Sequence, residues 1–466
     1  MNAGASPPQD GFDPARLNPY AAPQAGEIVA PPLDTAGLPK LYRDHSFWGM
    51  IATQFLGAFN DNLFKQLMLL LSLKVVVGED RQSLASFIFS APFLLFSGYA
   101  GFLADRYSKR KVIVLCKMAE IGIMLLGLMA FLSFTQVGYP GLLFVLFLMG
   151  SHSAFFGPSK YGILPEMLRA QDLPRANGIL LMTTFLAIIF GGAIGGVLSN
   201  FAIPDDMPLA ASASRLWMAS AVCIGIAMTG SLTALLVRRV PAAVPNLRFR
   251  YSALTIPPEM REMLRRDRPL LGAVLASSVF WLVAGVAPLA VNSLGKTQLL
   301  LNDTLASILM ASIGVGIGIG SVLAGRLSRG TADFRLMQWG GWGLIAVLLV
   351  ISLPGPFHGH LLGFWGSLVA LIVMGMFAGM YAIPLQVFMQ SRPPEGQKGR
   401  MIAVMNQANF AAIFVSSGVY WIFDRIVVWC DLPRCVIFAL TSGIMVTTVI
   451  LYRPRLDTAP RITTKN

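Results

Sequence analysis

The chain has 466 residues, of which 55% are hydrophobic and only 13% are charged, and its mean hydropathy is +0.64. Soluble domains carry about twice that share of charged residues, so the composition excludes a soluble globular protein and indicates a polytopic membrane protein. The formal net charge is +13, but its distribution follows membrane topology, as described below, and we expect no nucleic-acid partner.

The N-terminal segment, residues 1–43, is rich in Pro, Ala, Gly and Asp and contains no long apolar run. It lacks the features of a signal peptide and of a packed domain, so we expect a disordered cytoplasmic tail.

Apolar stretches of roughly 20 residues, the length that crosses about 30 Å of hydrocarbon as a helix, recur from there onward. Twelve spans are predicted, at 46–73, 84–104, 112–135, 140–165, 176–202, 215–237, 269–294, 304–325, 336–354, 360–390, 399–425 and 433–452. The expected fold is an all-α membrane protein made of two six-helix pseudo-repeats. The first half would occupy 44–237, a basic cytoplasmic linker 238–268, the second half 269–453 and a cytoplasmic tail 454–466.

Lysine and arginine fall in alternate loops of this arrangement. The loops after spans two, four, eight and ten are basic (Arg106, Lys109, Arg110, Lys111, Arg169, Arg175, Arg326, Arg329, Arg335, Arg392, Lys398 and Arg400). The opposite loops are sparse in charge or acidic, as at Asp205 and Asp206. Cytoplasmic loops accumulate positive charge, so both termini are expected to be cytoplasmic and the arginine-rich linker is expected to lie along the inner leaflet.

A charged turn at 101–111, GFLADRYSKRK, separates the second and third spans. Gly101 would permit close helix packing, and Asp105 would cap or pair at a helix end. The turn would be held on the cytoplasmic side by Arg106, Arg110 and Lys111. The pattern G-x-L-A-D-R-x-x-x-R-K resembles the loop between helices 2 and 3 of major facilitator superfamily transporters, and this resemblance implies a gate that controls conformation.

The second half contains a degraded copy of this turn. Leu323–Ser328 repeats Leu103–Ser108 with Gly325 in place of the aspartate. Many secondary transporters are built from such repeats, with the substrate path between the halves near the membrane midplane.

Three segments of the first half resemble the bacterial lysophospholipid transporter family: Phe59–Asn62, Gly157–Glu166 and Arg175–Gly178. This family has free-standing members and members fused to acyltransferase and acyl-ACP synthetase modules. The resemblance implies alternating-access transport of lysophospholipids from the outer to the inner leaflet of the bacterial inner membrane, for reacylation. We expect a separate acyltransferase as a partner and a monomeric transporter. Some members carry an arginine in the seventh span, whereas this chain is apolar from Trp281 to Val291, which leaves the exact lipid open.

Asp61 lies near the middle of the first span, where an ionised carboxylate costs on the order of 3 kcal/mol. Lys65, one turn later, and Lys160 are the candidate partners. Two interpretations stay open. In the first, Asp61 is half of a permanent structural ion pair. In the second, Asp61 changes its partner or its protonation state during transport, and Asn60 and Asn62 supply carbonyl groups to a headgroup or to a coupling ion (proton or sodium).

The segment Gly157–Ser159 is expected to break or kink the fourth span beside Lys160, which would either bind a phosphate or extend to the interface. Lys117 and Glu120 are spaced to pair with each other, and a hydrogen-bonded core histidine is the expected role of His152. The remaining candidate contacts to substrate or ion are Tyr161, Asn177, Gln386, Asn406 and Asn409.

Enzymatic motifs are missing from the sequence. No H-x-x-x-x-D follows any histidine, and the phosphate-loop-like Gly295–Thr297 has Ala290 where the first glycine belongs. We therefore expect no acyltransferase, no ATPase and no cofactor. The alternative that stays open is a major facilitator exporter or importer of an amphipathic metabolite or drug. Cys430 and Cys435 flank a short outer loop, where a disulfide is possible.

Overall fold

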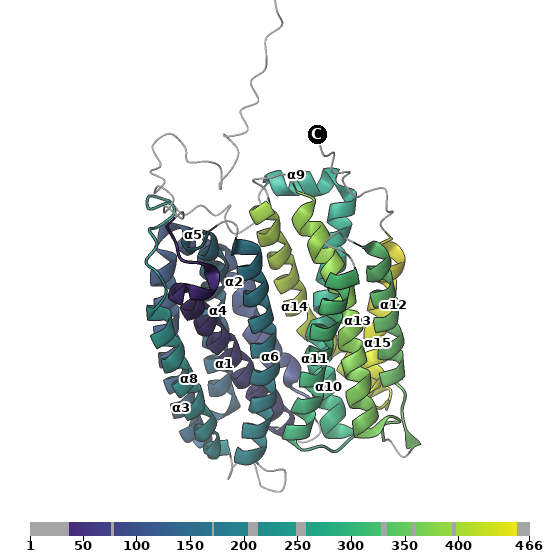
Figure 1. Cartoon of the computed structure of the whole chain (residues 1–466). Helices are drawn as coiled ribbons and strands as arrows, with labels where there is room; N and C mark the ends of the chain where they lie inside the picture. Colours follow the sequence, from purple (N-terminus) through teal and green to yellow (C-terminus); the bar gives the residue numbers. More distant parts are fainter. Residues whose placement is uncertain are drawn as a thin grey trace, which may run out of the picture.

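The computed structural model describes residues 37–75, 79–169, 172–203, 213–247, 258–327, 333–356, 359–393 and 398–453. Within these ranges twelve helices of 16 residues or more run side by side in one bundle (Figure 1). They are α1 (His45–Val75), α2 (Gln82–Arg106), α3 (Lys109–Leu132), α4 (Phe134–Gly162), α6 (Leu173–Ala202), α8 (Trp217–Leu235), α10 (Arg268–Thr297), α11 (Asp303–Leu327), α12 (Phe334–Ile351), α13 (Gly363–Ser391), α14 (Lys398–Trp429) and α15 (Val436–Leu451). The short elements are η2 (Leu41–Arg43), α5 (Leu164–Met167), η4 (Ala213–Leu216) and α9 (Pro258–Arg266).

Each long helix overlaps one predicted span. Ten of those in the described ranges are long and apolar enough to cross a membrane. The other two are α1, which has the polar run Asn60–Asn62 in its middle, and α15, which has only 16 residues. The all-α fold is thus confirmed, and membrane crossing by α1 and α15 stays a prediction.

The long helices pack as two groups. In the first, α1 packs on α6 and α8, and α4 packs on α2 and α3; in the second, α13 packs on α11 and α12, and α14 packs on α10. The groups meet where α6 contacts α11 and α2 contacts α14. Backbones approach closely between α11 and α13, because a Cβ at Gly316 would lie 2.0 Å from the Ile372 carbonyl oxygen. Glycine is therefore required there.

The path of α4 differs from the prediction. Its one residue with non-helical torsions is Gly138 (φ 59°, ψ −166°), and the helix continues through Pro158 to Gly162. The helix therefore does not break at Gly157–Ser159, and the alternative of a kink there stays a prediction. Proline fixes φ near the helical value, so a helix can pass through it at the loss of one hydrogen bond, whereas the positive φ of Gly138 does change the chain direction.

The N-terminal segment also differs in its last residues. Leu41 of η2 is only 2% exposed and packs in a core cluster with Phe47 and Met50. Disorder is thus wrong for 41–43, because a buried leucine holds them on the bundle. The rest of the predicted tail up to residue 36, the tail at 454–466 and part of the linker at 248–257 lie outside the described residues.

The two ends of the bundle differ in charge. We call one the basic face: it holds the end of α2, the start of α3, α5 and α9, and α9 lies across it (Figure 1). We call the other the opposite face: it holds the end of α1 and the start of α2 and α11. The positive-inside rule predicts that the basic face is cytoplasmic. This orientation and the division of the chain into two six-helix halves both stay predictions.

Candidate functional site: a buried charge cluster and two gates

A cluster of charged side chains lies inside the first helix group. Glu120 of α3 accepts a hydrogen bond from Asn60 Nδ2 at 2.7 Å and pairs with Lys117 Nζ at 2.6 Å. His152 Nε2 of α4 lies 3.4 Å from the same carboxylate. All four side chains are at most 7% exposed. The predicted pairing of Lys117 with Glu120 and the hydrogen-bonded state of His152 are both confirmed.

The hydrogen bonds of His152 indicate its charge. Its Nδ1 lies 2.6 Å from the Met149 carbonyl oxygen, which can only accept, while Nε2 faces the Glu120 carboxylate. Both ring nitrogens can donate only in the imidazolium. If Asp61 is ionised, the positive charges of Lys117 and an imidazolium at His152 balance the negative charges of Glu120 and Asp61.

Asp61 does not pair with either predicted partner. Its Oδ2 accepts from Ser153 Oγ at 2.5 Å, while Lys65 Nζ lies 5.1 Å from the centre of the Phe89 ring. Lys160 Nζ lies over the ring of Tyr161, at 4.7 Å from its centre. Helical spacing allows an Asp61–Lys65 pair, but here the long lysine side chain reaches the aromatic ring of α2 instead. Both expected ion pairs are therefore wrong for this conformation.

Two acceptor atoms at the cluster have no hydrogen-bond partner in the described part of the chain: Asp61 Oδ1 and Asn60 Oδ1, both buried. Unsatisfied buried acceptors are costly. Two such acceptors on adjacent residues make this cluster a candidate site for a proton, a cation or a donor group of a substrate.

The other candidate residues are dispersed. Asn62 Nδ2 and Asn177 Nδ2 each donate to a carbonyl one turn earlier in their own helix, at 2.7 and 3.0 Å. Asn409 accepts from Ser277 Oγ at 3.1 Å, which joins α14 to α10. Gln386 and Asn406 are half-buried on α13 and α14, and Tyr161 is 46% exposed. Substrate contact by these residues stays a prediction.

Polar contacts at the basic face join two of the sequence motifs, and we call them the basic-face gate after their expected role. Lys109 at the start of α3 pairs with Glu166 of α5 and lies 3.9 Å from Asp105. Arg110 donates to the carbonyls of Val237 and Leu235 at 2.6 and 3.0 Å, which fixes the end of α8. Partial burial raises the pKa of the Glu166 carboxyl although Lys109 opposes this shift. Lys109, which the sequence pattern identified only as part of a basic loop, contacts both carboxylates at this face.

Three residues of the turn motif play smaller parts. Arg106 lies over the rings of Phe102 and Tyr107, at 5.7 Å from each centre, and Lys111 is exposed. A Cβ at Gly101 would meet no atom within 4 Å. The expected close packing at Gly101 is therefore wrong here. The close approach of α2 occurs at Gly150 of α4, where a Cβ would lie 2.3 Å from the Phe89 carbonyl oxygen.

Replacing Glu166 with Gln is expected to shift the gate more than replacing Asp105 with Ala. Glu166 holds the buried Lys109, a charged hydrogen bond worth about 2 kcal/mol, whereas the Asp105 side chain is 37% exposed and more distant. Both changes should alter the rate of interconversion between access states more than substrate affinity. Single-molecule fluorescence across the basic face, combined with equilibrium binding, measures both quantities. A large loss of affinity at an unchanged interconversion rate would contradict a gating role.

A second cluster of ion pairs, which the sequence did not predict, lies at the opposite face. The buried carboxylate of Asp303, at the start of α11, pairs with Lys74 of α1 at 2.8 Å and with Lys296 of α10 at 2.9 Å. Ser199 of α6 donates to the same carboxylate at 2.6 Å. We call Lys74, Ser199, Lys296 and Asp303 the opposite-face cluster. It joins both helix groups, and its signal in the sequence was a charge at the ends of spans one, seven and eight.

Further polar contacts between the groups surround this cluster. Gln66 Nε2 donates to Asn292 at 3.0 Å and to Ser307 at 2.9 Å. Gln82 accepts from Asn292 Nδ2 at 3.0 Å, and Tyr420 donates to Asp80 at 2.5 Å. These contacts all lie toward the opposite face, so the described conformation is closed there.

The comparisons with known proteins agree with this architecture. A family model described as Major Facilitator Superfamily matches residues 46–417. The chain belongs to this superfamily. Its fold is similar to a bacterial homologue of the iron transporter ferroportin in the inward-facing state (TM-score 0.61, 13% identity, 88% of this chain and 100% of that one). It is also similar to a POT family transporter in complex with 5-aminolevulinic acid (TM-score 0.67, 11% identity, 87% and 94%). At such identities these likenesses show the fold alone.

Two curated relatives are more similar in sequence. The lysophospholipid transporter LplT of Klebsiella pneumoniae subsp. pneumoniae is 26% identical over 401 residues, which cover 82% of this chain and 89% of that relative. LplT of Salmonella typhimurium is 28% identical over 397 residues, which cover 80% and 86%. The resemblance drawn from the motifs is therefore confirmed, and the chain is a multi-pass membrane transporter rather than a member of an enzyme family.

Proposed function

We propose that this protein moves lysophospholipids across the bacterial inner membrane by alternating access, from the outer to the inner leaflet. The observation that carries the proposal is the combination of the polar Asp61 cluster in one helix group with the apolar segment Trp281–Val291 of α10 in the other. A single-chain lipid has a charged head and a tail that gains about 0.8 kcal/mol per buried CH₂. The two relatives described above, which match about four-fifths of this chain, are named as lysophospholipid transporters and support the same substrate class.

In this mechanism the headgroup binds near Asp61 and Lys160, and the acyl chain lies toward Trp281 and Pro288 of α10. The basic-face gate and the opposite-face cluster open in alternation, so the conformation closed at the opposite face is the one that delivers substrate. Both termini are cytoplasmic, the protein acts as a monomer, and a separate acyltransferase consumes the delivered lipid. A gradient of substrate, protons or sodium drives the cycle.

Uptake of labelled lysophosphatidylethanolamine and lysophosphatidylglycerol into proteoliposomes tests the substrate class. The assay is run without a gradient, with a proton gradient and with a sodium gradient, and with empty liposomes as control. Saturable uptake of either lipid supports the proposal. If the purified protein binds no lysophospholipid but binds a small polar solute saturably, it is a facilitator of that other class of substrate.

Replacing Trp281 with Ala is expected to change the preference among acyl chain lengths. Trp281 is half-buried and packs edge-on against Phe280, at 5.9 Å between ring centres. The smaller side chain removes apolar surface from the tail region and favours longer chains, by about tenfold in relative uptake for two additional CH₂ groups. Competition between lysolipids of different chain length measures this ratio. Trp365→Ala, at a tryptophan that is 75% exposed, is the control, and equal profiles for both variants would contradict the placement of the tail.

A further inference from the structure

The helix α9 forms because its apolar and charged residues separate onto different sides. Met260 and Leu264, one turn apart, are buried against the second helix group, where α9 contacts α10 and α14. Asp267 then ends α9 and caps α10 by accepting from the Leu270 backbone N–H at 3.2 Å. Arg392 of α13 pairs with Asp267 at 2.8 Å and fixes this corner. The helix is therefore held rigidly across the basic face (Figure 1).

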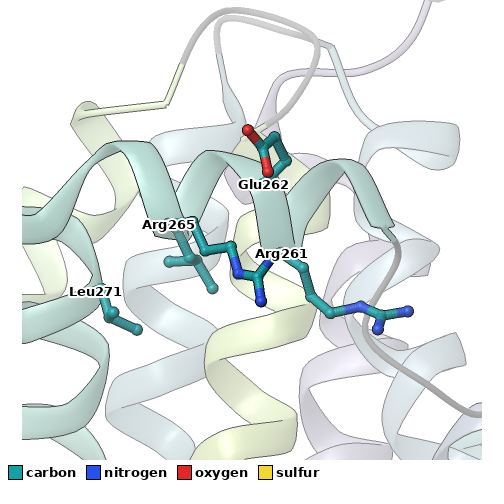
Figure 2. A pocket seen from close by; sticks show the side chains of 5 residues that line it. Arg261, Glu262, Arg265 and Leu271 are labelled. Carbon is teal, nitrogen blue, oxygen red and sulfur yellow. The ribbon is translucent and has the colours of Figure 1, made fainter.

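A pocket of about 390 Å³ opens between α9 and the first turn of α10, lined by Arg261, Glu262, Leu264, Arg265 and Leu271. Figure 2 shows that Arg261 and Arg265 project from one side of α9, whereas Glu262 points away from them. Glu262 pairs with Arg266 at 2.7 Å. The charge of Glu262, which also lines the pocket, is thus balanced by Arg266, and Arg261 and Arg265 contribute positive charge to the pocket rim.

The level of this pocket matches a membrane interface. The apolar run of α10 begins directly after Arg268, and Leu271, half-buried, belongs to its first turn. Arg261 and Arg265 therefore lie beside the start of this apolar run (Figure 2), where we expect lipid phosphates to meet hydrocarbon. Guanidinium groups bind phosphate oxygens by paired hydrogen bonds, and basic groups at the cytoplasmic surface favour anionic lipids.

We propose that the pocket between α9 and α10 binds one anionic phospholipid of the surrounding leaflet, with its phosphate on Arg261 and Arg265 and an acyl chain along Leu264 and Leu271. This lipid is a resident ligand, separate from the transported substrate.

Lipid binding to the full-length protein in nanodiscs tests the proposal directly. The probe is a photoactivatable phosphatidylglycerol, with a photoactivatable phosphatidylcholine as the zwitterionic comparison. In the wild type, crosslinks of phosphatidylglycerol should concentrate on peptides that contain 258–271. Equal labelling of these peptides by both lipids would overturn the proposal. Because it uses the unmodified protein, this result does not depend on the folding of a variant or on transport of any lysophospholipid.

The charge-removing variant Arg261→Gln/Arg265→Gln should lose the preference for phosphatidylglycerol by about thirty-fold, from the contribution of two basic residues near a membrane surface. The control Arg266→Gln/Arg268→Gln removes two neighbouring charges outside the pocket and should retain most of the preference. An equal loss in both variants would mean that only net charge matters and would overturn the site. Displacement of the lipid by millimolar inorganic phosphate would likewise show an anion site instead of a lipid site.

Discussion

Replacing Asp61 with Asn is expected to leave the protein folded and inserted while reducing lysophospholipid transport by at least about 100-fold, equivalent to about 2.7 kcal/mol. Asparagine keeps the shape and can still accept from Ser153, which now lies 2.5 Å from Asp61 Oδ2. It removes the charge that balances the cluster of Lys117, Glu120 and His152. It also removes the buried Oδ1 acceptor, which has no partner among the described residues.

The measurement is initial uptake into proteoliposomes with matched amounts of inserted protein. Ser153→Ala is the control, because it removes the hydrogen bond to Asp61 but keeps the charge, and it should cost only about 1 kcal/mol, or fivefold. Wild-type rates in Asp61→Asn would show that the carboxylate is a structural feature of the first helix group. Equal losses in both variants would assign the effect to the hydrogen bond.

The sequence predicted the membrane-spanning helices well because each depends on a local property, the length of an apolar run. It also predicted the pair Lys117–Glu120, since both residues lie on one face of a single helix. It failed for Asp61, whose partner Ser153 is on another helix. Local spacing shows which pairs can form, but the choice among them depends on how the helices pack.

The opposite-face cluster shows the same limit more strongly. Lys74, Lys296 and Asp303 each end or begin a helix, where a charge has an ordinary explanation in membrane topology. Only the packing of α1 against α10 and α11 buries the Asp303 carboxylate between two lysines of different helix groups. The pair Lys74–Asp303 joins residues 229 positions apart, so no pattern within a window of the sequence reveals it.

Replacing Asp303 with Asn is expected to shift the conformational equilibrium toward a state open at the opposite face. The change leaves the ammonium groups of Lys74 and Lys296 close together without their common carboxylate, while Lys74 retains its bond to the Ile203 carbonyl at 2.9 Å. Removing one partner from a buried ion pair costs about 3–5 kcal/mol. Separation of the helix groups relieves the repulsion, so the open population should rise by more than about 100-fold.

The open population is measured by labelling a Ser307→Cys variant with a membrane-impermeant maleimide. The variant is made in a background without the four native cysteines. All four are free thiols in the structure, including Cys430 and Cys435, between which the sequence allows a disulfide. Ser307 is fully buried beside Gln66 when the opposite face is closed, so its substituted cysteine should react only in the open state. Glu79→Gln is the control, because its pair with Arg81 lies at the same face but both side chains are over 40% exposed. Such exposed pairs contribute at most about 1 kcal/mol.

A second variant separates charge repulsion from general damage to the interface. If repulsion between the two lysines opens the protein, then Lys74→Gln/Lys296→Gln/Asp303→Asn, which removes all three charges, should label more slowly than Asp303→Asn alone. Transport by Asp303→Asn should fall because closure of the opposite face becomes the slow step, while lysophospholipid affinity measured in detergent changes little. Unchanged labelling of Ser307→Cys in the Asp303→Asn background would show that the polar contacts of Gln66, Gln82 and Asn292 hold the face closed without the ion pairs.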